Sequence, residues 1–149
     1  MTQAGESPHS SIFQATRMED LAELADFVDD ACQRAGVDAD VTFAVRLAVE
    51  EVFTNILRHG YADHSGPVNV TIHADAHRMQ VTLTDQAPVF DPVDAPVPDI
   101  AAPLEQREPG GLGWHLIRQL MDDIQHQAGR NGGNVLTLVK RLAPKDPST

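Results

Sequence analysis

Apolar residues recur at helical spacing in two segments of the N-terminal half of the chain. Over Met18–Ala35 they fall three and four positions apart, which predicts a helix with one buried face, and Gly36 supplies its stop. From about Asp38 or Asp40 to His59 the chain is apolar on nearly every side. A helix of that kind is buried on several sides, so this segment is not expected to lie on the surface.

Strict alternation of apolar and polar residues marks a predicted hairpin in the middle of the chain. Val68–Ala74 has its apolar residues on one face, and Met79–Asp85 repeats the pattern after a short connection. Two such runs joined closely predict an antiparallel hairpin with one face on a core. A weaker alternation over Ser11–Arg17 predicts a short edge strand.

A proline-rich segment, Gln86–Pro109, separates this hairpin from the C-terminal elements, and a loop of that length is usually either functional or disordered. A third helix is expected from about Trp114 to Asp122. Two strands, Ile124–Ala128 and Asn134–Leu142, then flank a glycine-rich turn and predict a second hairpin.

The order of these elements predicts an α+β fold, a two-layer α/β sandwich with helices packed on one face of a mainly antiparallel sheet. Residues 11–142 are expected to form the domain, between tails at residues 1–10 and 143–149. With 149 residues, 42% of them hydrophobic, one domain can bury a sizeable core.

The net charge of −11 argues against nucleic-acid binding and against docking on an anionic membrane. The two lysines, Lys140 and Lys145, do not follow a glycine, so a P-loop is excluded. A single cysteine, Cys32, excludes an intrachain disulfide and a four-cysteine zinc site. There is no long apolar run and no signal-peptide pattern, so a cytoplasmic location is expected.

Three polar features each allow both a structural and a functional interpretation. Glu51 and Asn55 share one face of the apolar helix, which is either a solvated face or a site for a metal or phosphate. Asp85 falls on the apolar parity of its strand, so its partner is either a ligand's amino group or a backbone or arginine donor. The glycine cluster around Gly110 and Gly113 opens a helix, either to bind an anion or to act as a hinge.

In order and spacing these features resemble the GHKL superfamily of ATP-binding domains, and more narrowly the bacterial anti-sigma factor serine/threonine kinases. The N box of that family resembles Glu51-Val52-Phe53-Thr54-Asn55 followed by His59-Gly60-Tyr61. The first glycine box resembles Asp85-Gln86-Ala87-Pro88-Val89-Phe90-Asp91-Pro92, and the second resembles Pro109-Gly110-Gly111-Leu112-Gly113-Trp114-His115-Leu116-Ile117. The resemblance covers residues 11–142.

The resemblance implies a Bergerat-type fold that binds ATP and Mg²⁺. It assigns the adenine amino group to Asp85, the metal to Asn55 and the general base to Glu51, with residues 91–109 as a lid over the phosphates. Ala87 departs from the family pattern, in which many relatives carry glycine. The residues expected to bind nucleotide are Asn55, Asp85, Ala87, Phe90, Gly110, Gly111, Leu112, Gly113 and Thr137.

The function implied by the resemblance is that of a kinase in a partner-switching system. Its substrate would be an anti-sigma-factor antagonist with a phosphorylatable serine, and its second partner a sigma factor; a homodimer is compatible with this interpretation. The alternative is a non-catalytic nucleotide-sensing module that sequesters a protein partner. Glu51 favours the enzyme, because a pure sensor needs no general base.

Overall fold

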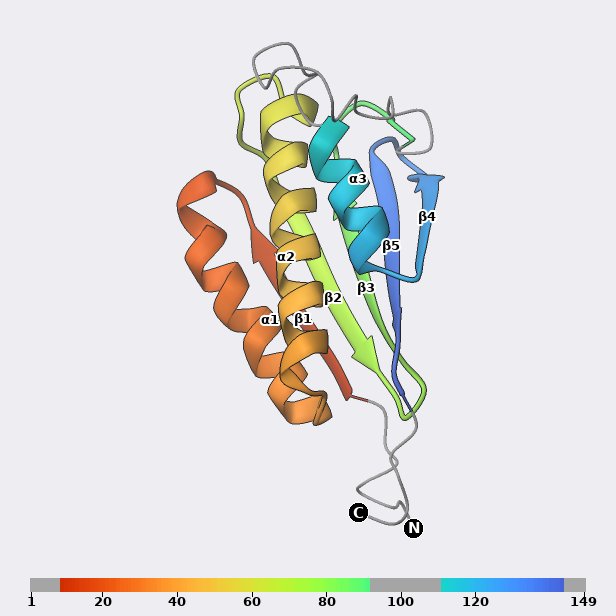
Figure 1. The fold of residues 1–149 in the computed structure, drawn as a ribbon. Helices are drawn as coiled ribbons and strands as arrows, with labels where there is room; N and C mark the ends of the chain where they lie inside the picture. Colours follow the sequence, from red (N-terminus) through yellow and green to blue (C-terminus); the bar gives the residue numbers. More distant parts are fainter. Residues whose placement is uncertain (1–8, 92–110, 144–149) are drawn as a thin grey trace, which may run out of the picture.

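The computed structural model describes residues 9–91 and 111–143, which form two layers (Figure 1). One layer is a five-stranded sheet with the order β1-β2-β3-β5-β4, in which every neighbouring pair is antiparallel. The other layer consists of helices that cover one face of this sheet. The predicted α+β sandwich is therefore confirmed.

The strands are β1 (His9–Ala15), β2 (Val68–Ala74), β3 (Arg78–Asp85), β4 (Asp123–Ala128) and β5 (Asn134–Arg141). Four of them lie within one residue of the predicted bounds. The first differs, because it begins at His9, inside the segment assigned to the N-terminal tail, and ends at Ala15. Its partner explains the shift, since β1 pairs with β2 along its whole length, from His9 opposite Ala74 to Ala15 opposite Val68.

Two long helices form the N-terminal part of the other layer. A short 3-10 turn, η2 (Met18–Asp20), leads into α1 (Leu21–Ala35), which ends at Gly36 with a left-handed φ of 73°. The next helix, α2 (Ala39–Asn55), begins at Asp38, whose side chain accepts a hydrogen bond from the Val41 amide at 2.8 Å. Both predicted helices are thus confirmed.

The helical layer is completed at the end of α2 and by a third helix. The chain continues from α2 as a π-helical turn, η3 (Ile56–Gly60), a rare form that is frequent at functional sites. The third helix, α3 (Gly111–Leu120), begins three residues before the predicted start at Trp114 and ends before Asp122. Its glycine-rich first turn is helical, although glycine favours helix poorly.

The core lies between the two layers, with α2 between α1 and α3 (Figure 1). The inner face of the sheet contributes residues such as Val70, Val81 and Leu138, and α2 contributes Val49 and Phe53. These side chains are almost all aliphatic, as the low aromatic content requires. No helix in the described part of the chain is long and apolar enough to cross a membrane.

Candidate functional site

Asp85 is a buried carboxylate at the end of β3. Its side chain is on the inner face of the sheet, in register with Asn134 on β5, and the residue is 4% exposed. Its Oδ1 accepts two hydrogen bonds of 2.9 Å, from the Ala87 amide and from Asn134 Nδ2. Among the described residues, no hydrogen bond to Oδ2 is found. One oxygen is therefore held by the protein and the other is available to a ligand.

Burial dominates the electrostatics of this carboxylate. It raises the pKa of Asp85 above the ordinary value, because the charged form loses its hydration. The hydrogen bonds from Asn134 and Ala87 act in the opposite direction, since they stabilise the carboxylate. The donor partner that the sequence required is thus provided in part by the protein itself, from a backbone amide and an amide side chain.

Asn134 is a site residue that the sequence analysis missed. Beyond Asp85, its Nδ2 donates to the Pro88 carbonyl at 3.1 Å, and its Oδ1 accepts from the Phe90 amide at 2.9 Å. His126 Nε2, on β4, lies 2.7 Å from the same Oδ1. The signal was present in the sequence, because Asn134 has the apolar parity of β5 just as Asp85 has that of β3.

Thr137, which was expected to bind nucleotide, does not lie beside Asp85 and Asn134. It pairs with Thr82 in the β3–β5 register, while its neighbours Leu136 and Leu138 are buried on the inner face. Because successive side chains of a strand point to opposite faces, Thr137 lies on the face of the sheet that the helices do not cover. Asn134 takes the place opposite Asp85 instead.

The end of η3 is attached to the segment that follows Asp85. The Tyr61 hydroxyl accepts a hydrogen bond from the Gln86 amide at 2.7 Å and donates one to the Pro67 carbonyl at 2.6 Å. A Cβ placed on Gly60 would lie 2.9 Å from the Cβ of the buried Ala87. The His-Gly-Tyr segment and the first glycine box, distant in sequence, therefore form one wall.

Glu51 and Asn55 lie one helical turn apart on α2, directly before the π-helical turn. Glu51 is half-buried, while Asn55 is 8% exposed. Asn55 Nδ2 is buried and has no hydrogen-bond partner, whereas its Oδ1 is accessible, as far as the described residues extend. A buried amide left half-unpaired carries a cost, so a partner outside the described protein atoms, such as a water or a ligand, is expected at this nitrogen.

The remaining predicted residues lie around the start of α3. Gly111, Leu112 and Gly113 form its first turn. Gly110 and most of the predicted lid lie outside the described residues. Phe90 is half-exposed, and its ring centroid is 6.3 Å from that of Trp114 on α3, with the planes tilted by 35°. The first and second glycine boxes are therefore in contact through this aromatic pair.

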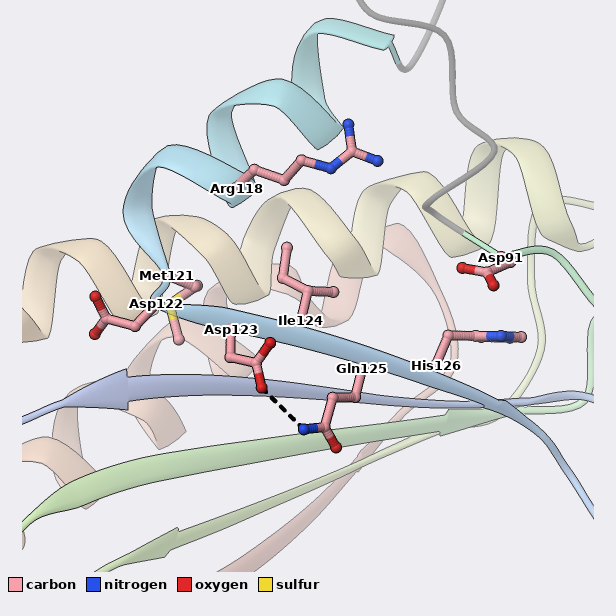
Figure 2. A pocket seen from close by; sticks show the side chains of 8 residues that line it. All are labelled: Asp91, Arg118, Met121, Asp122, Asp123, Ile124, Gln125 and His126. Carbon is pink, nitrogen blue, oxygen red and sulfur yellow. Dashed lines mark hydrogen bonds between the residues drawn. The ribbon is translucent and has the colours of Figure 1, made fainter.

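A cavity of about 510 Å³ lies beside this group, between α3 and β4 (Figure 2). Arg118 reaches over it from α3, while Asp123 and Gln125 are hydrogen-bonded to each other along β4 at 2.8 Å. None of the residues expected to bind nucleotide lines it. The lining residues are Asp91, Arg118, Met121, Asp122, Asp123, Ile124, Gln125 and His126.

The possible metal ligands on α2, Asn55 and Glu51, suit a metal ion that binds together with a nucleotide better than one held by the protein alone. In the described ranges, no group of three or more His, Cys, Asp or Glu side chains could hold a metal ion. Mg²⁺ typically keeps several waters and takes one or two protein oxygens together with substrate phosphates. The accessible Asn55 oxygen is a hard ligand of that kind, and Glu51 one turn earlier adds a carboxylate to the same helix face.

Comparison with known proteins identifies the ATPase family that the sequence motifs resemble. The family described as "Histidine kinase-like ATPase domain" matches residues 14–140. The chain is 30% identical over 108 residues to the serine/threonine-protein kinase BtrW of Bordetella bronchiseptica, covering 72% of this chain and 75% of the relative. It is 33% identical over 121 residues to the serine-protein kinase RsbW of Halalkalibacterium halodurans, covering 77% and 72%.

Solved structures share the fold at lower identity. The RsbU and RsbW domains of a Mycobacterium tuberculosis protein match with a TM-score of 0.61 at 16% identity, over 91% of this chain and 33% of that longer one. The mycobacterial sensor histidine kinase MprB matches with a TM-score of 0.53 at 17% identity, over 94% of this chain and 99% of that one.

Proposed function

This chain belongs to the family of histidine kinase-like ATPase domains, and we propose that it is an ATP-dependent serine/threonine protein kinase of a partner-switching system. Its relatives that are named serine/threonine-protein kinase BtrW and serine-protein kinase RsbW support this activity. The observation that carries the proposal is Asp85, a buried carboxylate with one oxygen held by two hydrogen bonds, on the wall where the residue after η3 meets the segment after β3.

Asp85 recognises the adenine ring in this proposal. A carboxylate is a hydrogen-bond acceptor only, and the adenine amino group is a donor. Oδ2 can therefore accept a hydrogen bond from the amino group while Oδ1 keeps its own hydrogen bonds. In a desolvated pocket such a pairing discriminates well, because a base with an oxygen at that position leaves two acceptors facing each other.

Asn55 would hold Mg²⁺ through its amide oxygen, and Mg²⁺ when bound neutralises charge on the phosphates. The buried and unpartnered Nδ2 on the same amide supports this role, because a purely structural asparagine would pair both atoms. The first turn of α3, with its glycines, would present backbone N–H groups to the phosphates, as helix N-termini do.

Glu51 would act as general base toward a serine of the protein substrate. The serine oxygen forms a bond to the γ-phosphorus while the bond from that phosphorus to the bridging oxygen breaks, and ADP leaves. The hydroxyl proton passes to the Glu51 carboxylate. General-base help of this kind contributes roughly 10²–10⁴-fold.

The substrate and the second partner follow from the family. The substrate would be an anti-sigma-factor antagonist with a phosphorylatable serine, and the phosphorylated antagonist would leave the kinase free to bind a sigma factor. The net charge of −11 fits protein partners with basic surfaces and disfavours direct contact with nucleic acid.

Phosphoryl transfer from γ-labelled ATP to a candidate antagonist tests the proposal, once binding of that antagonist has been demonstrated. We expect label on serine with wild type and at least about a hundredfold slower transfer with Glu51→Gln, at near-normal ATP affinity. Glu50→Gln is the matched control, because it makes the same change at the adjacent position, on a different helix face, and should leave transfer unchanged. If ATP alters affinity for a bound partner while no variant transfers phosphate, the chain is a nucleotide-sensing module instead.

A further inference from the structure

We infer that Asn134 and His126 are positioning residues for adenine selectivity: they hold the Asp85 carboxylate so that Oδ2 alone meets the nucleotide base. This inference rests on the proposed role of Asp85 and extends it to two residues that are outside the nucleotide-binding motifs. Both residues come from the C-terminal hairpin, Asn134 from β5 and His126 from the edge strand β4.

The orientation of the Asn134 amide is fixed by its surroundings. Nδ2 faces three oxygens, those of the Asp85 side chain at 2.9 Å, the Pro88 carbonyl at 3.1 Å and the Ala87 carbonyl at 3.5 Å. Oδ1 faces two nitrogens, the Phe90 amide at 2.9 Å and His126 Nε2 at 2.7 Å. A flipped amide would place its oxygen against the carboxylate and the carbonyls, so the network admits one orientation.

This orientation determines what His126 does. Because Asn134 Oδ1 is an acceptor, His126 Nε2 must carry the hydrogen and donate it, whichever the charge of the ring. The imidazole thereby holds the amide from the side opposite Asp85. His126 also lines the cavity between α3 and β4 (Figure 2). Two consecutive hydrogen bonds, from His126 to Asn134 and from Asn134 to Asp85, link β4 to the carboxylate.

The consequence for recognition lies in the two oxygens of Asp85. Oδ1 accepts hydrogen bonds from Asn134 and Ala87, so the carboxylate cannot rotate without losing both bonds. The orientation of Oδ2 is therefore fixed. A freely rotating carboxylate could turn away from an oxygen on the base and pair with water. A fixed one cannot, so it penalises hypoxanthine, which carries an oxygen where adenine carries an amino group.

The test is the ratio of the dissociation constants for IDP and ADP, measured by calorimetry on the full chain. Asn134→Asp is the sharpest variant, because it keeps the shape while it turns the Nδ2 donor into an acceptor that faces Asp85. Asn131→Asp adds the same charge at an exposed position in the β4–β5 turn and is the matched control. His126→Leu removes the donor from β4, and His126→Gln provides an N–H near the position of Nε2.

We expect wild type and Asn131→Asp to prefer ADP by about tenfold or more, and Asn134→Asp to lose most of this preference through weaker ADP binding. His126→Leu should reduce the ratio and His126→Gln should restore it. Where Asn134→Asp fails to fold, as judged by circular dichroism, the two His126 variants decide. An unchanged ratio in Asn134→Asp or in His126→Leu, or an equal loss for both nucleotides, overturns the inference and leaves the role of Asp85 standing. Absence of an ADP preference in wild type overturns that role and the inference with it.

Discussion

Gly60 and Ala87 are in direct contact, and the space between them admits one methyl group. A Cβ on Gly60 would lie 2.9 Å from the Ala87 Cβ, closer than carbon atoms approach without a shift. The family resemblance implies glycine at the position of Ala87, and the residue that faces Ala87 is Gly60. The Ala87 methyl group thus packs against Gly60 at the end of η3.

The first prediction follows from this contact. Gly60→Ala should destabilise the fold by about 1–3 kcal/mol through overpacking, although alanine alone favours a helical turn. In the Ala87→Gly background the same change should cost far less, because the obstructing methyl is gone. Urea unfolding of the four proteins of this double-mutant cycle measures the coupling. Equal costs in both backgrounds would show that the two residues do not compete for the space.

Asp85→Asn should separate binding from stability. Burial raises the pKa of this carboxyl above the ordinary 3.8, so in that pH range the folded state binds more protons than the unfolded chain. Stability contributed by this group is therefore fully present below 3.8 and is lost as the pH rises through the higher folded-state value. At pH 7 the variant, which keeps an acceptor for Asn134 and Ala87, should unfold at an equal or higher urea concentration than wild type.

The same variant should bind ADP at least about tenfold more weakly, because its amide presents a donor to the adenine amino group. Calorimetry and urea unfolding at pH 7 give the two quantities on one preparation. Lower stability together with unchanged ADP affinity would contradict the prediction on both counts, and would indicate that Asp85 is a structural carboxylate.

The sequence predicted the helices and strands, because alternation and helical periodicity mark them. It also predicted those site residues that stand out from the pattern of their own helix or strand. Asp85 was found from the parity of β3 alone. Asn134 and His126 were not, because their contact with Asp85 depends on β5 lying between β3 and β4 and on a register that pairs residues far apart in sequence. Thr137 lies on the outer face of β5, because it alternates with the buried Leu136 and Leu138.

The start of β1 shows a second limit of the same kind. The pattern over the first residues is weak, and the strand extends to His9 because β2 provides a partner over its full length. Gly60 follows the predicted end of the second helix at His59, whereas its close packing against Ala87 is a tertiary contact that no local pattern encodes. Local sequence thus predicted the elements, and long-range pairing determined how they complete the site.

Cys32 should be chemically silent in the folded protein. It is fully buried, its Sγ lies 3.8 Å from the Met79 sulfur, and burial raises the pKa of the thiol, so thiolate is scarce. We expect a thiol reagent at pH 8 to react at least about a hundredfold more slowly with native protein than with protein in urea, because labelling requires opening of the core. Cys32→Ala provides the blank. Native labelling at the rate seen in urea would mean that α1 leaves the sheet far more readily than its packing indicates.

The last prediction concerns Asn55 and the metal. Asn55→Ala removes an amide whose nitrogen is buried without a partner and whose oxygen is accessible, so the folded protein loses no hydrogen bond within its described residues. Its unfolding free energy should change by less than about 2 kcal/mol, the effect of a small cavity partly offset by loss of an unpaired polar atom.

ATP affinity in Mg²⁺ should fall at least about tenfold, whereas affinity in EDTA should fall much less, because the lost group acts through the cation. Asn69→Ala, on the outer face of β2, is the matched control and should change neither affinity. Calorimetry in the two buffers decides: an equal loss in Mg²⁺ and in EDTA would assign Asn55 to the architecture of the pocket and remove it from the metal site.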